Sequence, residues 1–177
     1  MKQYLFICAM LFCYCRMFTA CSPTPEKYFD VAVLNSNMVV GFGDDGFSRL
    51  IASPSVKLVE GTKDQTAPMK HIEMINDRTV YLEETLKKLK GMGETDDSKD
   101  ILQNSIALHE YIIPVCKTEY TELAKLYDEN APKEKIDAAT KNINDKYYPR
   151  FNELYEKLIA SGKTYATKHN IKVNWAM

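Results

Sequence analysis

The stretch 101-ILQNSIALHEYIIPVCKTEYTELAKLY-127 decides the fold, because its apolar residues recur at the period of an α-helix. Alternating steps of four and three residues keep these side chains on one side of a helix. The stripe consists of Leu102, Ile106, His109, Ile113, Cys116, Tyr120, Leu123 and Tyr127, and Leu108, Ile112 and Val115 widen it. A stripe of this width predicts a helix over residues 98–129 that is buried between two neighbours.

The same period recurs in three other parts of the chain. It predicts helices over residues 26–51, 66–90 and 132–169. Gly91 and Gly93 follow the second of them, where a C-terminal cap belongs, and Pro132 suits the first turn of the last. Because only short loops separate the last three predicted helices, they must pack antiparallel. We therefore predict an all-α fold, an antiparallel four-helix bundle with long, proline-kinked helices and a short extended tail over residues 171–177.

Gly41, Gly43 and Gly46 have the G-x-G-x-x-G spacing of a dinucleotide-binding turn. The helical period runs through them in register, which a strand followed by a phosphate-binding turn would not require. Asp44 and Asp45 would also lie against a pyrophosphate and repel it. We therefore predict no dinucleotide site and place the glycines in the first helix, which either packs closely there or breaks into two shorter helices.

The N-terminal segment has the properties of an export signal. Residues 4–15 contain no charge, and a helix of that length is too short to cross a bilayer. After it, Phe18-Thr19-Ala20-Cys21 resembles the lipobox of bacterial lipoprotein precursors. The resemblance implies cleavage before Cys21 and acylation of its thiol, which would attach the chain to a membrane. An ordinary signal peptide that happens to contain cysteine is the alternative.

This resemblance implies a division of the chain into a signal peptide (1–20), a tether (21–25) and a helical-bundle domain (26–177). The tether sequence is proline-rich and reads as extended. Cys116 is then the only cysteine of the folded body, so no internal disulfide forms. Because no aspartate follows Cys21, the sorting rule of some Gram-negative bacteria favours the outer membrane.

Two further stretches, EYTELAKLYDE (119–129) and YATKHNIKV (165–173), accompany the lipobox. Together they resemble a family of uncharacterised envelope lipoproteins with a helical-bundle body from Gram-negative bacteria. The resemblance implies a location in the cell envelope and supplies no catalytic residue.

Charge argues against a nucleic-acid partner. The formal net charge is -1, and no run of Lys or Arg exceeds two residues. The expected partners are therefore the membrane, through lipid on Cys21, and another envelope protein.

The sequence offers little support for a metal or haem site. The Glu-x-x-His pairs of di-iron bundles do not precede His71, His109 or His169. A b-type haem between Met38 and His169 rests on residue types alone. His109 and Cys116 lie on the buried stripe and are expected to be core residues, so we predict no cofactor and no catalytic residue.

Two prolines mark the most distinctive level of the predicted bundle. Pro114 and Pro149 lie at similar distances from the turn between the last two helices, so in an antiparallel pair they face one another. Paired kinks there could splay the helices around a pocket for a small apolar ligand. The residues expected to line it are Tyr111, Cys116, Tyr147 and Tyr148. The alternative is that the kinks only curve the helices around a filled core.

The sequence thus favours a non-enzymatic binding or structural lipoprotein of the envelope. A carrier or sensor of a small apolar ligand is the second reading, and a haem or metal protein the third.

Overall fold

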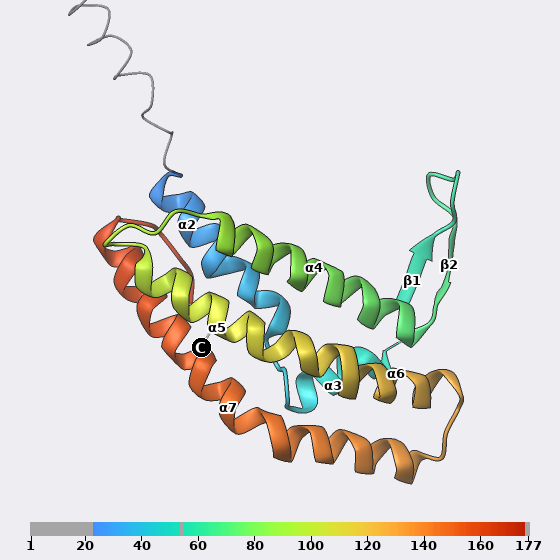
Figure 1. Cartoon of the computed structure of the whole chain (residues 1–177). Coiled ribbons are helices and arrows are strands. Elements are labelled where there is room, and N and C mark those ends of the chain that lie inside the picture. The colour runs from blue at the N-terminus through green and yellow to red at the C-terminus, as the bar shows by residue number, and fades with distance from the viewer. Residues whose placement is uncertain (1–22, 54, 176–177) are drawn as a thin grey trace, which may run out of the picture.

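The computed structural model describes residues 23–53 and 55–175, and these are mostly helical (Figure 1). The predicted signal peptide and Cys21 lie outside the described residues. So do the last two residues of the predicted tail.

Most of the body consists of α4 (His71–Gly91), α5 (Lys99–Val115), the short α6 (Thr121–Asp128) and α7 (Lys133–Lys168). The helix α5 runs antiparallel to both α4 and α7 and packs against each of them, as Figure 1 shows. Their apolar stripes meet in one core, which includes Leu82, Ile101, Leu108, Ile112 and Leu158. The last predicted helix, 132–169, is confirmed almost to the residue.

The predicted helix 98–129 is one rod with a π-helical segment, η2 (Cys116–Tyr120), between α5 and α6. Pro114 precedes this segment and has no N–H to donate to the carbonyl one turn earlier. Nearby threonines supply extra donors: the Thr118 hydroxyl donates to the Pro114 carbonyl at 3.0 Å, and the Thr121 hydroxyl to the Cys116 carbonyl at 2.9 Å. The two threonine hydroxyls therefore donate hydrogen bonds to backbone carbonyls whose α-helical hydrogen bonding the π-helical turn disrupts.

Of the two alternatives predicted for residues 26–51, the structure shows the one in which the helix breaks at the glycines. The N-terminal segment consists of α2 (Pro25–Ala32), a 3-10 helix η1 (Leu34–Val39) and α3 (Asp45–Ala52). The break before α3 has a conformational cause: Gly41 and Gly43 have φ of 80° and 71°, which a right-handed helix cannot contain. Of these elements α2 packs against α4, α5 and α7, so the N-terminal segment still covers the long helices.

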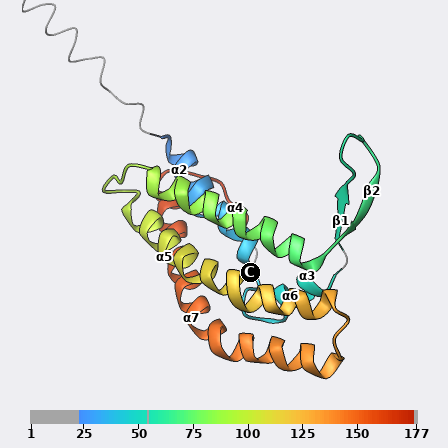
Figure 2. The same ribbon diagram turned by 45° about the vertical axis from the view of Figure 1, so that its right-hand side comes forward.

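A β-hairpin replaces the predicted start of the second helix. Strand β1 (Ser55–Leu58) pairs antiparallel with β2 (Thr66–Met69), and the hairpin projects from the helices (Figure 2). The predicted helical start at residue 66 is therefore wrong. Pro68 pushes the preceding residue into an extended conformation, and α4 begins only at His71.

The start of α4 is capped from a distant element. Asp128, the last residue of α6, accepts hydrogen bonds from the backbone N–H groups of His71 at 2.8 Å and Ile72 at 3.0 Å. The ring Nδ1 of His71 lies 2.9 Å from the same carboxylate. Burial acts to raise the pKa of Asp128, but these donors outweigh it and lower the pKa. Asp128 therefore ties the end of α6 to the start of α4.

Replacing Asp128 by alanine is expected to lower the free energy of unfolding by about 1–2 kcal/mol, because two helix N-terminal donors lose their acceptor. Since the folded-state pKa is lowered, the ionised cap contributes fully above the ordinary Asp pKa of about 3.9 and loses its contribution as pH falls below it. Urea unfolding at neutral and acidic pH measures both effects. Asp137→Ala removes a solvent-exposed carboxylate from α7 and is the control; an equal loss in both variants at neutral pH would contradict the cap.

The chain after α7 turns back along the helices. Asn170 has φ of 56°, and the N–H of Ile171 bonds to the Ala166 carbonyl at 2.9 Å, which together end the helix. Ile171, Val173 and Trp175 then pack against the core in an extended segment. The described part of the tail thus agrees with the predicted extended conformation.

Candidate functional site

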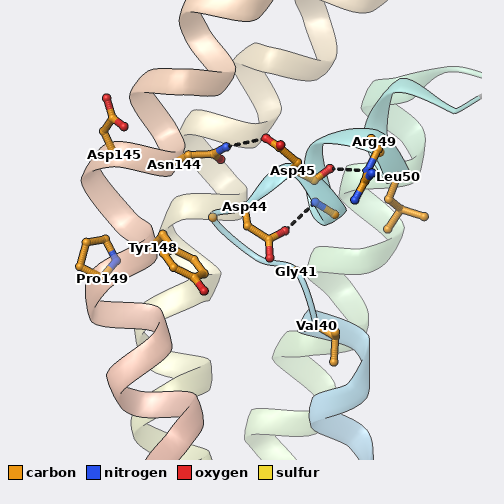
Figure 3. Close-up of a pocket in the computed structure, with 12 residues that line it drawn as sticks. Val40, Gly41, Asp44, Asp45, Arg49, Leu50, Asn144, Asp145, Tyr148 and Pro149 are labelled. Carbon is orange, nitrogen blue, oxygen red and sulfur yellow. Dashed lines mark hydrogen bonds between the residues drawn. The ribbon is translucent and has the colours of Figure 1, made fainter. Parts of the chain in front are cut away.

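A groove of about 950 Å³ lies between α7 and the turn formed by residues 40–46, here called the glycine turn (Figure 3). The turn and the start of α3 form one wall, and α7 at the level of Pro149 forms the other. Its lining residues are Val40, Gly41, Gly43, Asp44, Asp45, Gly46, Arg49, Leu50, Asn144, Asp145, Tyr148 and Pro149.

Backbone hydrogen bonds fix the shape of the glycine turn. The carbonyl of Gly41 accepts from the N–H groups of Asp44 at 3.1 Å and Phe47 at 2.9 Å. The Asp44 carboxylate accepts from the N–H of Gly46 at 2.5 Å and thereby caps α3. A carboxylate of the chain itself thus occupies the position that a phosphate would need in a dinucleotide-binding turn.

Gly43 places the glycine turn in direct contact with both η2 and α7. Its N–H donates to the buried hydroxyl of Tyr120, in η2, at 2.8 Å. A Cβ atom at Gly43 would lie 3.0 Å from the backbone N and Cα of Tyr148 in α7. The Tyr120 ring in turn contacts Phe42 and Phe47, with centroids 5.3 and 4.6 Å apart. The aromatic core therefore holds the groove wall in place.

The groove is acidic, with an apolar rim. Asp44, Asp45 and Asp145 contribute carboxylates, of which Asp145 is ion-paired with Lys141 on its own helix, and Arg49 contributes a guanidinium. Asn144 Nδ2 lies 3.4 Å from Asp45 Oδ1, which links the two walls across the groove (Figure 3). Val40, Leu50 and Tyr148 are each at least 38% exposed beside these charges. The arrangement suits a ligand with a positive charge and an apolar flank.

Of the residues predicted to line a pocket at the proline level, the structure brings Tyr111 and Tyr147 together, with ring centroids 6.4 Å apart, and places Tyr148 and Cys116 elsewhere. Tyr148 lines the groove, together with Pro149. Tyr111 donates to the Tyr147 carbonyl at 3.1 Å, and the Tyr147 hydroxyl donates to Glu119 at 2.8 Å, so these two tyrosines join α7 to α5 and η2. Cys116 is 1% exposed, and burial raises the pKa of its thiol to about 12.

The second wall of the groove is the part that sequence reasoning missed. The sequence predicts either close packing or a break at the glycines; the structure has the break, and the resulting turn faces Tyr148, which no sequence pattern indicates. The signal for the break was present in the sequence, because closely spaced glycines allow positive φ.

The histidines occupy unrelated places. His109 is fully buried; its Nδ1 lies 2.8 Å from the Ser105 carbonyl, and burial lowers its pKa. His169 packs against Tyr165 with ring centroids 4.3 Å apart, whereas Met38 lies on η1 and is 36% exposed. Within residues 23–53 and 55–175, no three His, Cys, Asp or Glu side chains gather as a metal site would require.

Across the described part of the chain, no helix has the length and apolar content needed to cross a membrane. No protein-family model matches the sequence, and no curated protein or solved structure matches it either. A functional proposal must therefore come from the chemistry of its residues.

Proposed function

We propose that this chain is a non-enzymatic lipoprotein of the bacterial cell envelope, attached to a membrane through lipid on Cys21. The observation that carries the proposal is Phe18-Thr19-Ala20-Cys21, which follows an uncharged segment too short to span a bilayer. The first helix, α2, begins at Pro25, so only a short tether would separate the lipid from the body. Two or more acyl chains suffice for stable anchoring. The outer membrane of a Gram-negative bacterium is the proposed location.

The proposed body is a modified antiparallel four-helix bundle. Three of its members are α4, the α5–α6 rod and α7, and the broken N-terminal segment takes the place of the fourth. The packing of α2 against all three members supports this assignment. A rigid bundle of this kind would present its loops, and the groove beside the glycine turn, to other molecules.

The groove is the proposed contact site for another envelope protein. Asp44 and Asp45, which form no ion pair within the described residues, outnumber the guanidinium of Arg49 and favour a partner segment that carries a basic side chain. Tyr148 and Leu50 supply exposed apolar area beside the charges, which is the usual composition of a binding surface. The described N-terminus enters α2, outside the lining of the groove, so an anchor at Cys21 would leave the groove accessible.

Replacing Cys21 by serine is expected to abolish acylation and cleavage at that site, because serine supplies no thiol for the lipid. The measurement is incorporation of an alkyne-labelled fatty acid in the native cell, together with the mass of the mature N-terminus. Cys15→Ser changes the same leader six residues earlier and should leave both readouts unchanged. An unmodified Cys21 in wild-type protein would contradict the proposal.

A carrier of a small apolar ligand is the second candidate. The observation in its favour is that Tyr148 and Pro149, from the predicted proline level, line the groove. Native mass spectrometry of the purified chain separates the candidates, since a carrier would retain a small molecule and a contact site for protein would not.

A further inference from the structure

A second, smaller hollow lies on the side of α7 that the C-terminal tail covers. It has a volume of about 400 Å³ and is bounded by η1, α7 and the extended tail. The helix contributes Tyr155, Ile159 and Lys163, which follow one another at intervals of four and so form one face. Trp175 of the tail forms the opposite side, and Figure 1 shows the tail returning along the helices.

A glycine lets the walls of this hollow come together. A Cβ at Gly162, inside α7, would lie 3.1 Å from a Val33 methyl carbon and 3.4 Å from the Trp175 ring. Glycine costs about 1 kcal/mol in a helix interior, so its place here is explained by this close packing. The rings of Phe29 and Trp175 pack edge to face with their centroids 5.9 Å apart, which also holds the Trp175 ring in place. The tail is therefore held against α7 by specific contacts, and the hollow lies beside it.

Lys163 is the single charged residue among those that line the hollow. Its side chain is exposed, and its ammonium lies 5.7 Å from the centroid of the Trp175 ring. Within the described chain it forms no ion pair with a carboxylate, whereas its neighbours Lys157 and Lys168 both do. A cation without an ion-pair partner in the described chain thus stands beside a hollow whose other lining residues are mainly apolar, with two amide side chains at Asn37 and Asn174.

We propose that this hollow binds a single-chain anionic amphiphile, with its alkyl chain against Ile159 and Trp175 and its head group at Lys163. The volume lies near the lower end for small-molecule sites, which favours one chain over two. A neighbouring hollow of about 450 Å³ shares Tyr155, Ile159 and Lys163 and leaves room for a longer chain along α7. Glu156 lines that part and accepts a hydrogen bond from Asn152 at 2.9 Å; its negative charge would repel an anionic head group there, so the head group belongs on the Trp175 side of Lys163. The inference does not depend on acylation of Cys21.

Trp175 is the only tryptophan of the chain, so its fluorescence reports directly on this site. The probe is 4,5-dibromododecanoate, whose bromine atoms lie near the head group and quench tryptophan on contact, added to the full-length chain. We expect saturable quenching that unbrominated dodecanoate or dodecyl phosphate reverses, and these two competitors distinguish a carboxylate from a phosphate head group. A brominated dodecyl trimethylammonium should bind more weakly than the carboxylate, because Lys163 repels its charge.

Lys163→Met removes the charge and keeps much of the alkyl stem, and it should weaken binding of the brominated carboxylate about tenfold. Lys157→Met, on the same helix outside the hollow, should leave binding unchanged. The proposal is overturned if quenching does not saturate, if the cationic probe binds as well as the anionic one, or if both lysine variants behave alike. Acyl labelling at Cys21 is a separate readout, so failure here and failure of the anchor are distinguishable.

Discussion

Replacing Gly43 by alanine is expected to destabilise the protein by about 3 kcal/mol, through two costs that act together. A side chain at φ of 71° is strained, and its Cβ would lie 3.0 Å from the backbone of Tyr148. Because backbone cannot rotate away as a side chain can, α7 or the glycine turn must move. The displacement would also stretch the hydrogen bond from Gly43 to Tyr120.

Gly61 offers a matched control for this substitution. It has φ of 79°, but nothing lies within 4 Å of the position where its Cβ would be. Gly61→Ala should therefore cost only the conformational strain, about 1 kcal/mol. Urea unfolding followed by circular dichroism measures both variants. An equal loss of unfolding free energy in both variants would show that the close approach of Gly43 to α7 does not contribute to stability.

Replacing Tyr120 by alanine is expected to cost about 3–5 kcal/mol, because it empties the centre of the aromatic cluster. The residue is fully buried, and its ring contacts both Phe42 and Phe47. Tyr120→Phe removes only the hydroxyl and leaves the N–H of Gly43 buried without an acceptor. That change should cost about 1–3 kcal/mol.

Tyr148→Phe is the control for the loss of a hydroxyl. Tyr148 is 40% exposed, so water can replace any bond its hydroxyl makes, and a change below about 0.5 kcal/mol is expected. The same unfolding measurement applies to all three variants. If Tyr120→Phe proved as mild as Tyr148→Phe, the hydrogen bond from Gly43 would not be what secures the turn.

The long helices could be predicted because their burial follows the helical period over many turns. The stripe that defined 98–129 places Leu102, His109, Cys116 and Tyr120 in the core, as the structure shows. Over 26–51 the same period holds only in part. It places Phe29, Val33, Ser36 and Phe47 in the core, as the structure does, but it also includes Val40 and Leu50, which are 56% and 38% exposed, and it omits Phe42, which is fully buried. The positive φ angles of Gly41 and Gly43 determine where that segment breaks, and the spacing of apolar residues contains no information about φ.

The hairpin was missed for a related reason. Val56 and Leu58 are 64% and 63% exposed, so β1 has no buried face to produce a clear alternation. The groove depends on the hydrogen bond between Gly43 and Tyr120. These residues are 77 positions apart in the sequence, so no local sequence pattern predicts the contact. The sequence places Tyr148 next to Pro149, but it does not predict that the glycine turn lies across the groove from Tyr148.

The π-helical segment also has a genetic consequence. A π turn closes after five residues where an α turn closes after four, so η2 is equivalent to one codon inserted into an uninterrupted helix. Here Thr118 and Thr121 donate hydrogen bonds to carbonyls of the disturbed ladder. The number of residues between Pro114 and Leu123 therefore decides which face α6 turns toward the core, so a one-codon deletion there would rotate α6 relative to α4 and α7.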